Sequence, residues 1–578
     1  MLEVLICGAG PVGSFFANLM EQFGHTYRII DSEPIEARLG QSRALLLTAR
    51  TLEVMEDRDI AREILSRALL SRGIRLHSDT KQLTEVEMSG LDSTFHHMTT
   101  LPQWRIEEIL HKRLSKKVER PVKLISYVQE SDHVVAKLQH GDDTDNIEEV
   151  KAKFLIGADG VHSTVRKGTP GWNFDGVVIN SPSVLADVTF TGDKLPDFRY
   201  FNFIDSKNGA LILIPIPDNS GEKIITRMVV SLGALSETKD NEGKVSQGIK
   251  NDAPPTLEEL QTLIDQRCGY FNMKAVNPQW IAKFGINERR ANGFRRGRCF
   301  VMGDAAHCHS PAGGQGLNLG FQDANNLAWK ISSVLKNTAE NPEVLLDSYY
   351  EERYPIIDTT INGTGRMGRS VFQRTIFSSF MRSLVLPMAL TIPSIHDKVG
   401  FTIQQLWITI PTSSALLAEK SASSIIEPGK YMPDSCTLNP KDIVNLPPQT
   451  IKSIFKKTDR YIALLVWNHA GDDDASAGFW NLLQTYKRFV RPIVVESKNY
   501  IGRYRVPQYA RNNADGTNGF WCDTRGRLAE LLGIEDNRAG IILVRPDMYV
   551  AFSESYDGQN EIPLESFERH LSSQVKSD

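Results

Sequence analysis

The sequence predicts an α/β fold in which a dinucleotide-binding domain carries an inserted antiparallel sheet and is followed by another α/β domain. Three observations support this prediction. Near the N-terminus an apolar run meets glycines and a helical stretch, strand-like runs follow one another between about residues 183 and 232, and new strand signals appear after residue 427. The length of 578 residues leaves room for about three to four domains.

The order of these patterns predicts that the first domain is discontinuous. Residues 1–180 would form its first part, and residues 181–285 the inserted sheet, whose strand-like runs are joined by Asp, Asn, Gly and Pro turns. Residues 286–426 would complete the first domain and add a helical region, because an apolar run again meets glycine and a long helical stretch there. Residues 427–578 would form the third domain.

Composition excludes several functional classes. Lys and Arg number 66 against 70 Asp and Glu, for a net charge of −4, so no basic field favours nucleic acid as a partner. The six cysteines form no C-x-x-C pair, which disfavours zinc ribbons and a secreted disulfide scaffold. No targeting segment and no run of about 20 apolar residues is visible, so we expect a cytoplasmic protein without a membrane span.

A G-x-G-x-x-G fingerprint follows the first expected strand. Gly8, Gly10 and Gly13 surround Pro11, and they allow a tight turn, a close approach to a pyrophosphate and close packing of helix on strand. Asp31 ends the next expected strand, where it could accept hydrogen bonds from a ribose. The pattern predicts a Rossmann-like unit, against the plainer interpretation of a packing turn, and it leaves NAD and FAD undecided.

Two further motifs resemble those of the single-component FAD-dependent aromatic hydroxylases. Residues 155–166, which read LIGADGVHSTVR, resemble the Asp-Gly motif of that family. Residues 300–307, FVMGDAAH, continued by SPAGGQGLN at 310–318, resemble its Gly-Asp motif. With the fingerprint, the three motifs cover roughly residues 1 to 390 in the family's order. The resemblance implies FAD as the cofactor.

Within that family the chain resembles phenol hydroxylase more than para-hydroxybenzoate hydroxylase. The reason is the additional C-terminal region, whose Val-Arg-Pro-Asp at 544–547 resembles part of a thioredoxin-like domain. Cys522 has no partner in a dithiol motif, which indicates a structural rather than a redox role for that domain. Dimerisation is expected from the family alone.

The resemblance also implies the cofactor contacts. Asp304 would accept a hydrogen bond from a ribityl hydroxyl, the helix that opens after residue 312 would point N–H groups at the flavin pyrimidine edge, and Asp159 would support the dinucleotide region. Arg43 and Gln103 would lie near the cofactor, although a surface ion pair or cap is as good an interpretation of either. The complete candidate set is Gly8, Gly10, Pro11, Gly13, Asp31, Arg43, Gln103, Asp159, Asp304, Pro311, Gly313, Gly314, Gln315, Gly316, Leu317 and Asn318.

The family's reaction implies NADPH or NADH as a transient reductant and O₂ as co-substrate, with oxygen transferred from a flavin C4a-hydroperoxide. Hydroxylation of an aromatic or polycyclic small molecule, in secondary metabolism, is the leading expectation. Epoxidation, Baeyer-Villiger insertion and a non-catalytic flavin-fold binding protein remain alternatives. The neighbours His307, Cys308 and His309 cannot easily point at one ion, so we expect no metal.

A phenolic substrate reacts faster as phenolate, so the site needs a group that lowers the phenol pKa. Arg227, on an expected strand, is the candidate for this catalytic role, with a solvent-facing strand residue as the plainer alternative. Pro311, inside the Gly-Asp motif, is the second catalytic candidate. The expected pocket wall consists of Tyr200, Phe203, Leu213 and Pro215 on neighbouring strands, together with Arg227.

Overall fold

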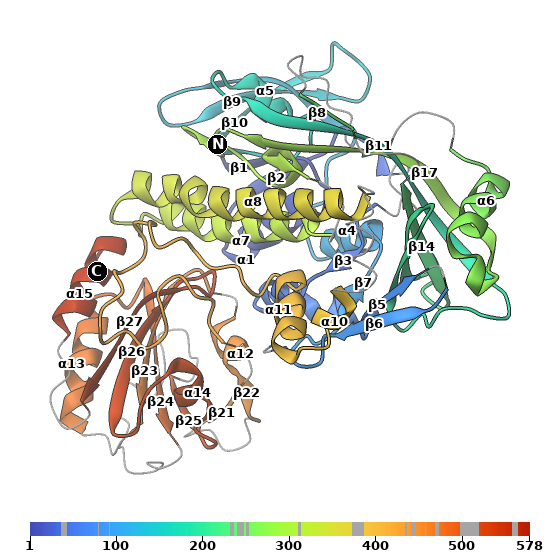
Figure 1. Cartoon of the computed structure of the whole chain (residues 1–578). Helices are drawn as coiled ribbons and strands as arrows, with labels where there is room; N and C mark the ends of the chain where they lie inside the picture. The colour runs from blue at the N-terminus through green and yellow to red at the C-terminus, as the bar shows by residue number, and fades with distance from the viewer. Residues whose placement is uncertain are drawn as a thin grey trace.

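The computed structural model confirms a mixed α/β fold (Figure 1). It describes residues 1–35, 43–78, 80–91, 93–231, 236–239, 248–249, 254–309, 314–372, 386–433, 436–440, 447–456, 458–468, 473–497, 519–557 and 564–577. Within these residues, three large sheets organise the fold, and a small sheet lies against the second. In the part of the chain that is described, no helix combines the length and apolar character needed to cross a lipid bilayer.

The first sheet contains the parallel unit that the N-terminal pattern predicts. Its strands are β1 (Leu2–Cys7), β2 (Tyr27–Ile30), β8 (Val122–Gln129), β9 (Val134–His140), β10 (Ile147–Gly157), β18 (Arg295–Arg296) and β19 (Cys299–Val301). Strand β1 pairs in parallel with β2 and β10, and β10 in parallel with β19. The domain is therefore discontinuous, because β19 joins the sheet only after the inserted region.

The second sheet is antiparallel over most of its strands and curves away from the first. Its strands are β5 (Gly73–Ser78), β6 (Gln82–Glu87), β11 (Phe174–Thr191), β12 (Phe201–Ser206), β13 (Gly209–Pro217), β14 (Ile224–Ser231), β15 (Ser236–Lys239), β16 (Gly248–Ile249), β17 (Lys274–Ala291) and β20 (His307–Cys308). Its residues are not confined to the expected range 181–285. Strand β5 pairs in parallel with β12, so a hairpin from the N-terminal region extends the sheet.

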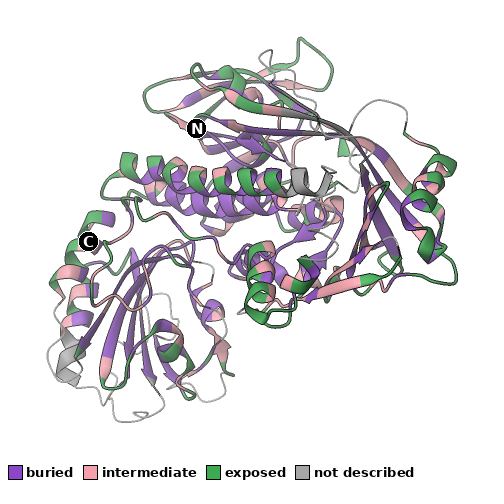
Figure 2. Ribbon diagram, viewed as in Figure 1, coloured by how far each residue is buried: buried purple, intermediate pink, exposed green. Residues whose placement is uncertain are grey.

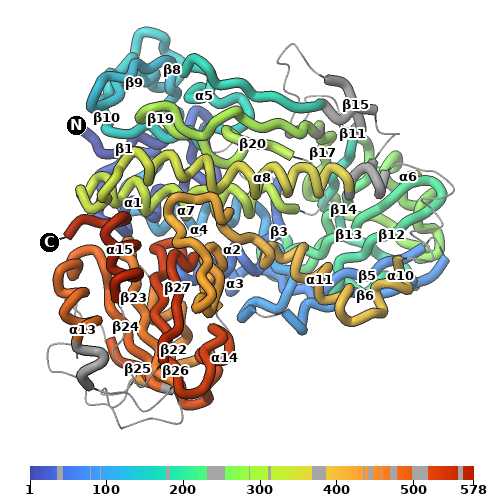
Figure 3. Tube along the Cα trace, turned by 60° about the vertical axis from the view of Figure 1, so that its left-hand side comes forward, coloured from blue at the N-terminus to red at the C-terminus, as the bar shows by residue number. Residues whose placement is uncertain are grey.

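Helices cover the sheets and connect them. They are α1 (Pro11–Gln22), α2 (Ala49–Glu56), α3 (Ala61–Leu65), α4 (Gln103–Lys112), α5 (Thr164–Gly168), α6 (Leu257–Cys268), α7 (Gly316–Leu335), α8 (Pro342–Phe372), α10 (Leu386–Ala389) and α11 (Pro393–Ile403). Helix α6 covers the outer face of the second sheet, while α7 and α8 lie between the first sheet and the C-terminal domain (Figures 1 and 3). The small sheet consists of β3 (Leu46–Leu47), β4 (Leu69–Ser71) and β7 (Met98–Thr100).

The C-terminal domain is built on a mixed sheet. Its strands are β21 (Thr437–Pro440), β22 (Gln449–Thr450), β23 (Tyr461–Trp467), β24 (Val490–Ser497), β25 (Phe520–Asp523), β26 (Arg538–Val544) and β27 (Val550–Asp557). Its helices are α12 (Ile451–Phe455), α13 (Asp473–Gln484), α14 (Arg527–Leu532) and α15 (Glu565–Gln574). Central β23 runs parallel to β24 and antiparallel to β26. The thioredoxin-like assignment stays a prediction.

The hydrophobic core continues from the first sheet through α7 into the C-terminal domain. Figure 2 shows buried residues along α7 and along the strands of the C-terminal sheet. Trp329 of α7 and Tyr461 of β23 meet edge to face, with ring centroids 5.7 Å apart. The two domains therefore pack against each other through a buried contact that includes apolar side chains.

The contact between α1 and α7 gives a test of this core. Phe321 is fully buried and meets Phe15 edge to face at 5.3 Å. We expect Phe321→Ala to lower the free energy of unfolding by about 3–5 kcal/mol, because the aromatic contacts are lost and a cavity remains. Urea unfolding followed by far-UV circular dichroism measures this. Phe401→Ala, on α11 and 41% exposed, is the matched control, and equal losses in both variants would contradict the packing described.

Candidate functional site

Three motif loops begin side by side at the carboxyl edge of the first sheet. Cys7 of β1 is in register with Gly157 of β10, and Gly157 with Val301 of β19. The chain leaves these strands towards Gly8, Asp159 and Asp304 respectively. In open α/β sheets, ligands bind outside the carboxyl ends of such strands. The alignment therefore brings the three sequence motifs to one place.

The glycines of the fingerprint are required by close backbone contacts. Gly8 has φ +100°, and a Cβ there would lie 2.2 Å from the carbonyl oxygen of Ala158. A Cβ on Gly13 would lie 2.0 Å from the carbonyl oxygen of Gly8. Helix α1 begins at Pro11 after Gly10, with no side chain capping its N-terminus. Its first N–H groups remain donors for an anion.

Side chains from separate elements fix this loop. The Ala9 N–H donates to Asp31 Oδ2 at 2.7 Å, and the Ala9 carbonyl accepts hydrogen bonds from Ser14 Oγ and Arg120 Nη2, both at 3.1 Å. His111 Nε2 lies 3.1 Å from the same carbonyl. Asp31 Oδ1 accepts the N–H of Glu33, so both oxygens of the predicted ribose ligand already bind backbone. Sequence reasoning missed Ser14, His111 and Arg120, which carry no local signal.

Asp304 combines two properties of a ligand-binding carboxylate. It lies in the 3₁₀ turn η3 (Gly303–Ala305), where its neighbours are buried, yet its own side chain is exposed. Surrounding protein raises the pKa of its carboxyl, while the charges of His307 and Arg43 oppose that rise without cancelling it. A carboxylate that is accessible deep inside a protein fits the role of acceptor for a ribityl hydroxyl.

The N-terminus of α7 forms another part of the site. Gln315 precedes the helix without capping it, and Gly316 and Leu317 open its first turn. Asn318 is fully buried: its Nδ2 donates to the carbonyls of Leu46 and Gly314, both at 2.9 Å, and its Oδ1 accepts the Thr48 N–H. Asn318 thus positions the turn and is saturated by protein contacts. Pro311 and Gly313 lie outside the described residues.

Arg43 and Gln103 adjoin each other. Gln103 is the first residue of α4, and its Oε1 accepts the N–H of Ala44 at 3.3 Å while its Nε2 donates to Glu107 at 2.9 Å. Arg43 is exposed and close enough to Asp304 to influence its pKa. The structure therefore brings Arg43, Gln103 and Asp304 to one side of the sheet edge.

Asp159 supports the neighbouring loop. Its Oδ2 accepts the N–H groups of Thr164 and Val165 at the start of α5, at 2.7 and 3.3 Å. Burial raises the pKa of this carboxyl despite those hydrogen bonds. Arg166 of α5 donates to the carbonyl of Ala305 at 2.6 Å, so the Asp-Gly loop is tied to the Gly-Asp turn.

Arg227 is buried and is not a solvent-facing strand residue. Its Nη2 donates to Asp187 Oδ2 at 3.0 Å, its Nε also donates to Asp187, and its guanidinium lies over the Trp280 ring at 4.7 Å. Its Nη1 donates to the carbonyl of Arg43 at 3.0 Å. The Asp187 carboxylate offsets the positive charge expected to lower a phenol pKa. The contacts instead tie the second sheet to the segment beside Asp304.

The predicted pocket wall is divided between the two faces of the second sheet. Arg227 pairs with Ile214, so alternation along β13 places Leu213 and Pro215 on the opposite face. Leu213 belongs to the cluster that includes Leu260 of α6. Grouping Leu213 and Pro215 with Arg227 was therefore wrong, because the strand period of two separates them.

Tyr200 contacts residues that are not part of the expected pocket wall. Its hydroxyl donates to Glu87 at 2.8 Å, and Arg75 covers its ring at 3.9 Å. Of the expected wall, Phe203 is half-buried and pairs with Ile212, which pairs with Val229. The face that carries Arg227, opposite α6, is the inner face of the sheet. It holds two cross-strand rows: an apolar row of Phe203, Ile212, Val229 and Leu185, and a row of Ile214, Arg227, Asp187 and Trp280 that contains the ion pair.

These features fit FAD. The glycine cradle that a Cβ would fill, the uncapped starts of α1 and α7, and the accessible carboxylate of Asp304 match the pyrophosphate, the ring edge and the ribityl chain. No group of three or more His, Cys, Asp or Glu side chains among the described residues is arranged to hold a metal ion. His307 Nε2 instead lies 2.6 Å from Asp323 Oδ2.

Comparison with known proteins finds similar monooxygenases. An uncharacterised aromatic compound monooxygenase of Bacillus subtilis is 33% identical over 368 residues, which are 63% of this chain and 67% of that protein. The 6-methylpretetramide 4-monooxygenase of Streptomyces rimosus is 32% identical over 68% of this chain and 64% of its own length. The matched regions thus span about two thirds of these relatives.

Solved structures share the fold over nearly the whole chain. The OxyS anhydrotetracycline hydroxylase from Streptomyces rimosus has a TM-score of 0.68 at 24% identity, covering 99% of both chains. Aklavinone-11 hydroxylase, in a complex with FAD and aklavinone, has a TM-score of 0.68 at 20% identity, covering 99% of this chain and 98% of its own. The family model described as "FAD binding domain" matches residues 1–364. The chain therefore belongs to the FAD-binding domain family of flavin-dependent aromatic monooxygenases.

Proposed function

We propose that this protein uses FAD, NADPH or NADH, and O₂ to hydroxylate a phenolic or polycyclic aromatic small molecule. The observation that carries the proposal is the junction at Arg43. The charge of Arg43 acts to lower the pKa of the Asp304 carboxyl at the cofactor edge, and its backbone carbonyl accepts a hydrogen bond from Arg227 on the inner face of the second sheet. The cofactor edge and a partly apolar sheet face are thus joined at Arg43. Oxygen transfer requires such an arrangement, because the aromatic substrate must lie next to the cofactor.

The chain's own residues would hold and orient the cofactor. The N-terminus of α1 would bind the pyrophosphate, Asp304 would accept a hydrogen bond from a ribityl hydroxyl, and the N-terminus of α7 would favour negative charge at the ring edge. When bound, FAD supplies the redox chemistry by accepting a hydride from the nicotinamide and activating O₂. Two relatives are named as an aromatic compound monooxygenase and as 6-methylpretetramide 4-monooxygenase, which supports an aromatic substrate.

The inner face of the second sheet would receive the substrate. The half-buried side chains of Phe203, Ile212 and Val229 offer an apolar wall that excludes water and packs against an aromatic ring. Arg227 then acts as a positioning residue, because its charge is paired with Asp187 and its hydrogen bond holds the Arg43 carbonyl. This role replaces the direct stabilisation of a phenolate.

One experiment tests the proposed function as a whole. The purified protein should release FAD on denaturation, and a panel of phenols and aromatic polyketides should stimulate its oxidation of NADPH or NADH. Mass spectrometry should find a product that has gained one oxygen atom. A colourless protein without bound or bindable FAD would leave the non-catalytic binding protein as the better interpretation.

Asp304→Asn tests the cofactor contact. We expect a FAD dissociation constant about ten- to a hundredfold higher, because a hydrogen bond to a charged acceptor contributes about 1.5–3 kcal/mol. Titration of the apoprotein followed by flavin fluorescence measures the constant. Asp142→Asn, in the exposed turn between β9 and β10, is the control, and wild-type affinity in Asp304→Asn would remove the role of Asp304.

Arg227→Met tests the junction between sheet and cofactor edge. We expect substrate-stimulated nicotinamide oxidation coupled to product to fall about ten- to a hundredfold, because small misplacements of reacting groups have effects of that size. Flavin content should change less, and more hydrogen peroxide should form per reductant consumed. Arg75→Met, on β5 of the same sheet and paired with Glu85 and Asp197, is the control. Equal losses of flavin and activity in Arg227→Met would indicate a purely structural role.

A further inference from the structure

Asp323 of α7 contacts the chain on both sides of Asp304, at Gly303 and at His307. This fully buried carboxylate accepts the Gly303 N–H at 3.2 Å on Oδ2, and the same oxygen lies 2.6 Å from His307 Nε2. Gly303 and His307 flank Asp304 on either side. The position of the Asp304 carboxylate therefore depends on the position of Asp323.

A buried arginine, Arg353, also binds the Asp323 carboxylate. Burial alone would raise the pKa of this carboxyl, but the charges of His307 and Arg353 outweigh burial and lower it. Arg353 of α8 donates through Nε to Asp323 Oδ1 at 2.7 Å and through Nη2 to the Leu319 carbonyl at 3.3 Å. Helix α8 is thus the second support of the cofactor turn.

The residue next to Arg353 binds the C-terminal domain. Arg545 donates to both oxygens of Glu352, at 2.7 and 2.9 Å, and all four side chains of this junction, Glu352, Arg545, Asp547 and Lys330, are fully buried. Arg545 also donates through Nε and Nη2 to the two carboxylate oxygens of Asp547, at 2.9 and 2.6 Å. The pKa of Glu352 is strongly lowered: burial opposes this shift, but the charges of Arg545 and Lys330 outweigh it.

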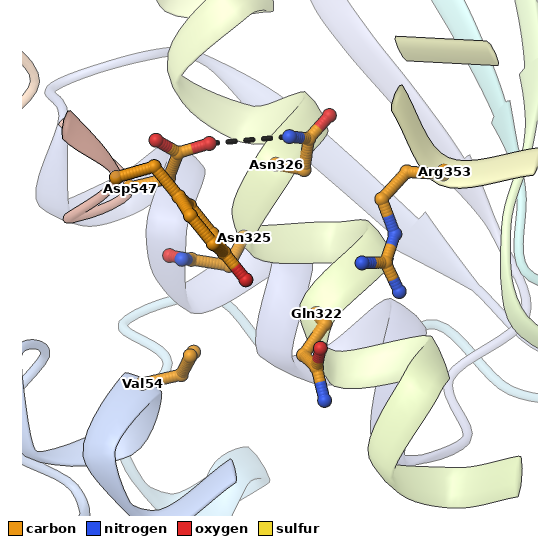
Figure 4. Close-up of a pocket in the computed structure, with 7 residues that line it drawn as sticks. Val54, Gln322, Asn325, Asn326, Arg353 and Asp547 are labelled. Carbon is orange, nitrogen blue, oxygen red and sulfur yellow. Dashed lines mark hydrogen bonds between the residues drawn. The ribbon is translucent and has the colours of Figure 1, made fainter. Parts of the chain in front are cut away.

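Figure 4 shows Asp547 of this junction and Arg353, the partner of Asp323, around one small cavity. Asp547, from the C-terminal domain, points at Asn326 of α7, and Arg353 points into the same small cavity. The cavity, of about 10 Å³, is lined by Val54, Gln322, Asn325, Asn326, Arg353, Asp547 and Tyr549. Arg353 therefore binds Asp323 and lines a cavity that Asp547 also lines.

Helix α8 transmits the contact because its relevant side chains share one face. Tyr349, Glu352 and Arg353 are three and four positions apart. The Tyr349 hydroxyl donates to the carbonyl of Val301, in the strand that leads to Asp304, at 3.0 Å. A shift of α8 towards or away from the C-terminal domain therefore moves both supports of the cofactor turn.

We propose that Arg545 is a positioning residue for the cofactor site: through Glu352, α8 and Asp323, the C-terminal domain fixes the Asp304 turn. The inference rests on the FAD site proposed above, and it gives the C-terminal domain a function. If Arg545 is removed, Glu352 and Asp547 stay buried with less positive charge near them. Two buried carboxylates with too little compensating positive charge are unfavourable, so we expect α8 and the loop that carries Asp547 to rearrange.

A double-mutant cycle with Arg545→Met and Asp323→Asn tests this inference. Arg545→Met should raise the FAD dissociation constant about two- to thirtyfold, the range that buried networks between sites commonly transmit. It should also alter the visible circular dichroism of bound flavin. In the double variant, the two effects on affinity should be clearly smaller than additive, because both variants loosen the same turn.

Arg538→Met is the matched control. Arg538 donates to Ser555 within the C-terminal domain, so its effect on FAD affinity should be small and should add to that of Asp323→Asn. Far-UV circular dichroism verifies folding. If Arg545→Met does not fold, Arg545→Lys takes its place in the cycle, since it keeps the charge but loses the two-pronged contact with Glu352.

The outcomes separate the two proposals. Additive effects, or FAD affinity and flavin dichroism unchanged in a folded Arg545 variant, overturn the positioning role while leaving the FAD site intact. A wild-type protein that binds no FAD overturns both. Smaller-than-additive effects together with altered flavin dichroism support the role of Arg545.

Discussion

The parallel alignment of β1, β10 and β19 is the constraint on which the site depends. Each strand ends at the same level, at Cys7, Gly157 and Val301, and each continues directly into a motif loop. Backbone hydrogen bonds set this register, so the relative positions of Gly8 and Asp304 do not rely on side-chain contacts alone. Everything added later, from the second sheet to the C-terminal domain, packs around an edge that these three strands define.

Much of this edge could be predicted because its signals are local in the sequence. Gly8 and Gly13 are required by close contacts with residues a few positions away or beside the adjacent strand. The motif around Asp304 is one continuous stretch of the sequence. The hydrogen-bond partners of these residues were harder to predict. Asp31 was correctly placed at a strand end, but its bond to the Ala9 N–H depends on how the loop closes, which no spacing in the chain reveals.

The register between strands is the main feature that could not be predicted from the sequence. Alternation along one strand says which residues share a face, but it does not say which face meets the cofactor edge or which residue lies opposite. The sequence therefore placed Leu213 with Arg227, whereas the pairing of Arg227 with Ile214 separates them. The buried partnership of Arg227 with Asp187 was likewise invisible, because the two residues lie on neighbouring strands whose pairing only the fold defines.

The discontinuity of the first sheet has a consequence during synthesis on the ribosome. Strand β19 follows β1 by roughly 290 residues, so at about 5–20 residues per second it is made roughly 15–60 s later. During that interval the end of β10 at Leu155–Gly157 lacks its neighbour β19, and the turn at Asp304 does not yet exist. The cofactor edge is therefore among the last parts of the nascent chain to form, and its final buried arginine, Arg545, arrives later still.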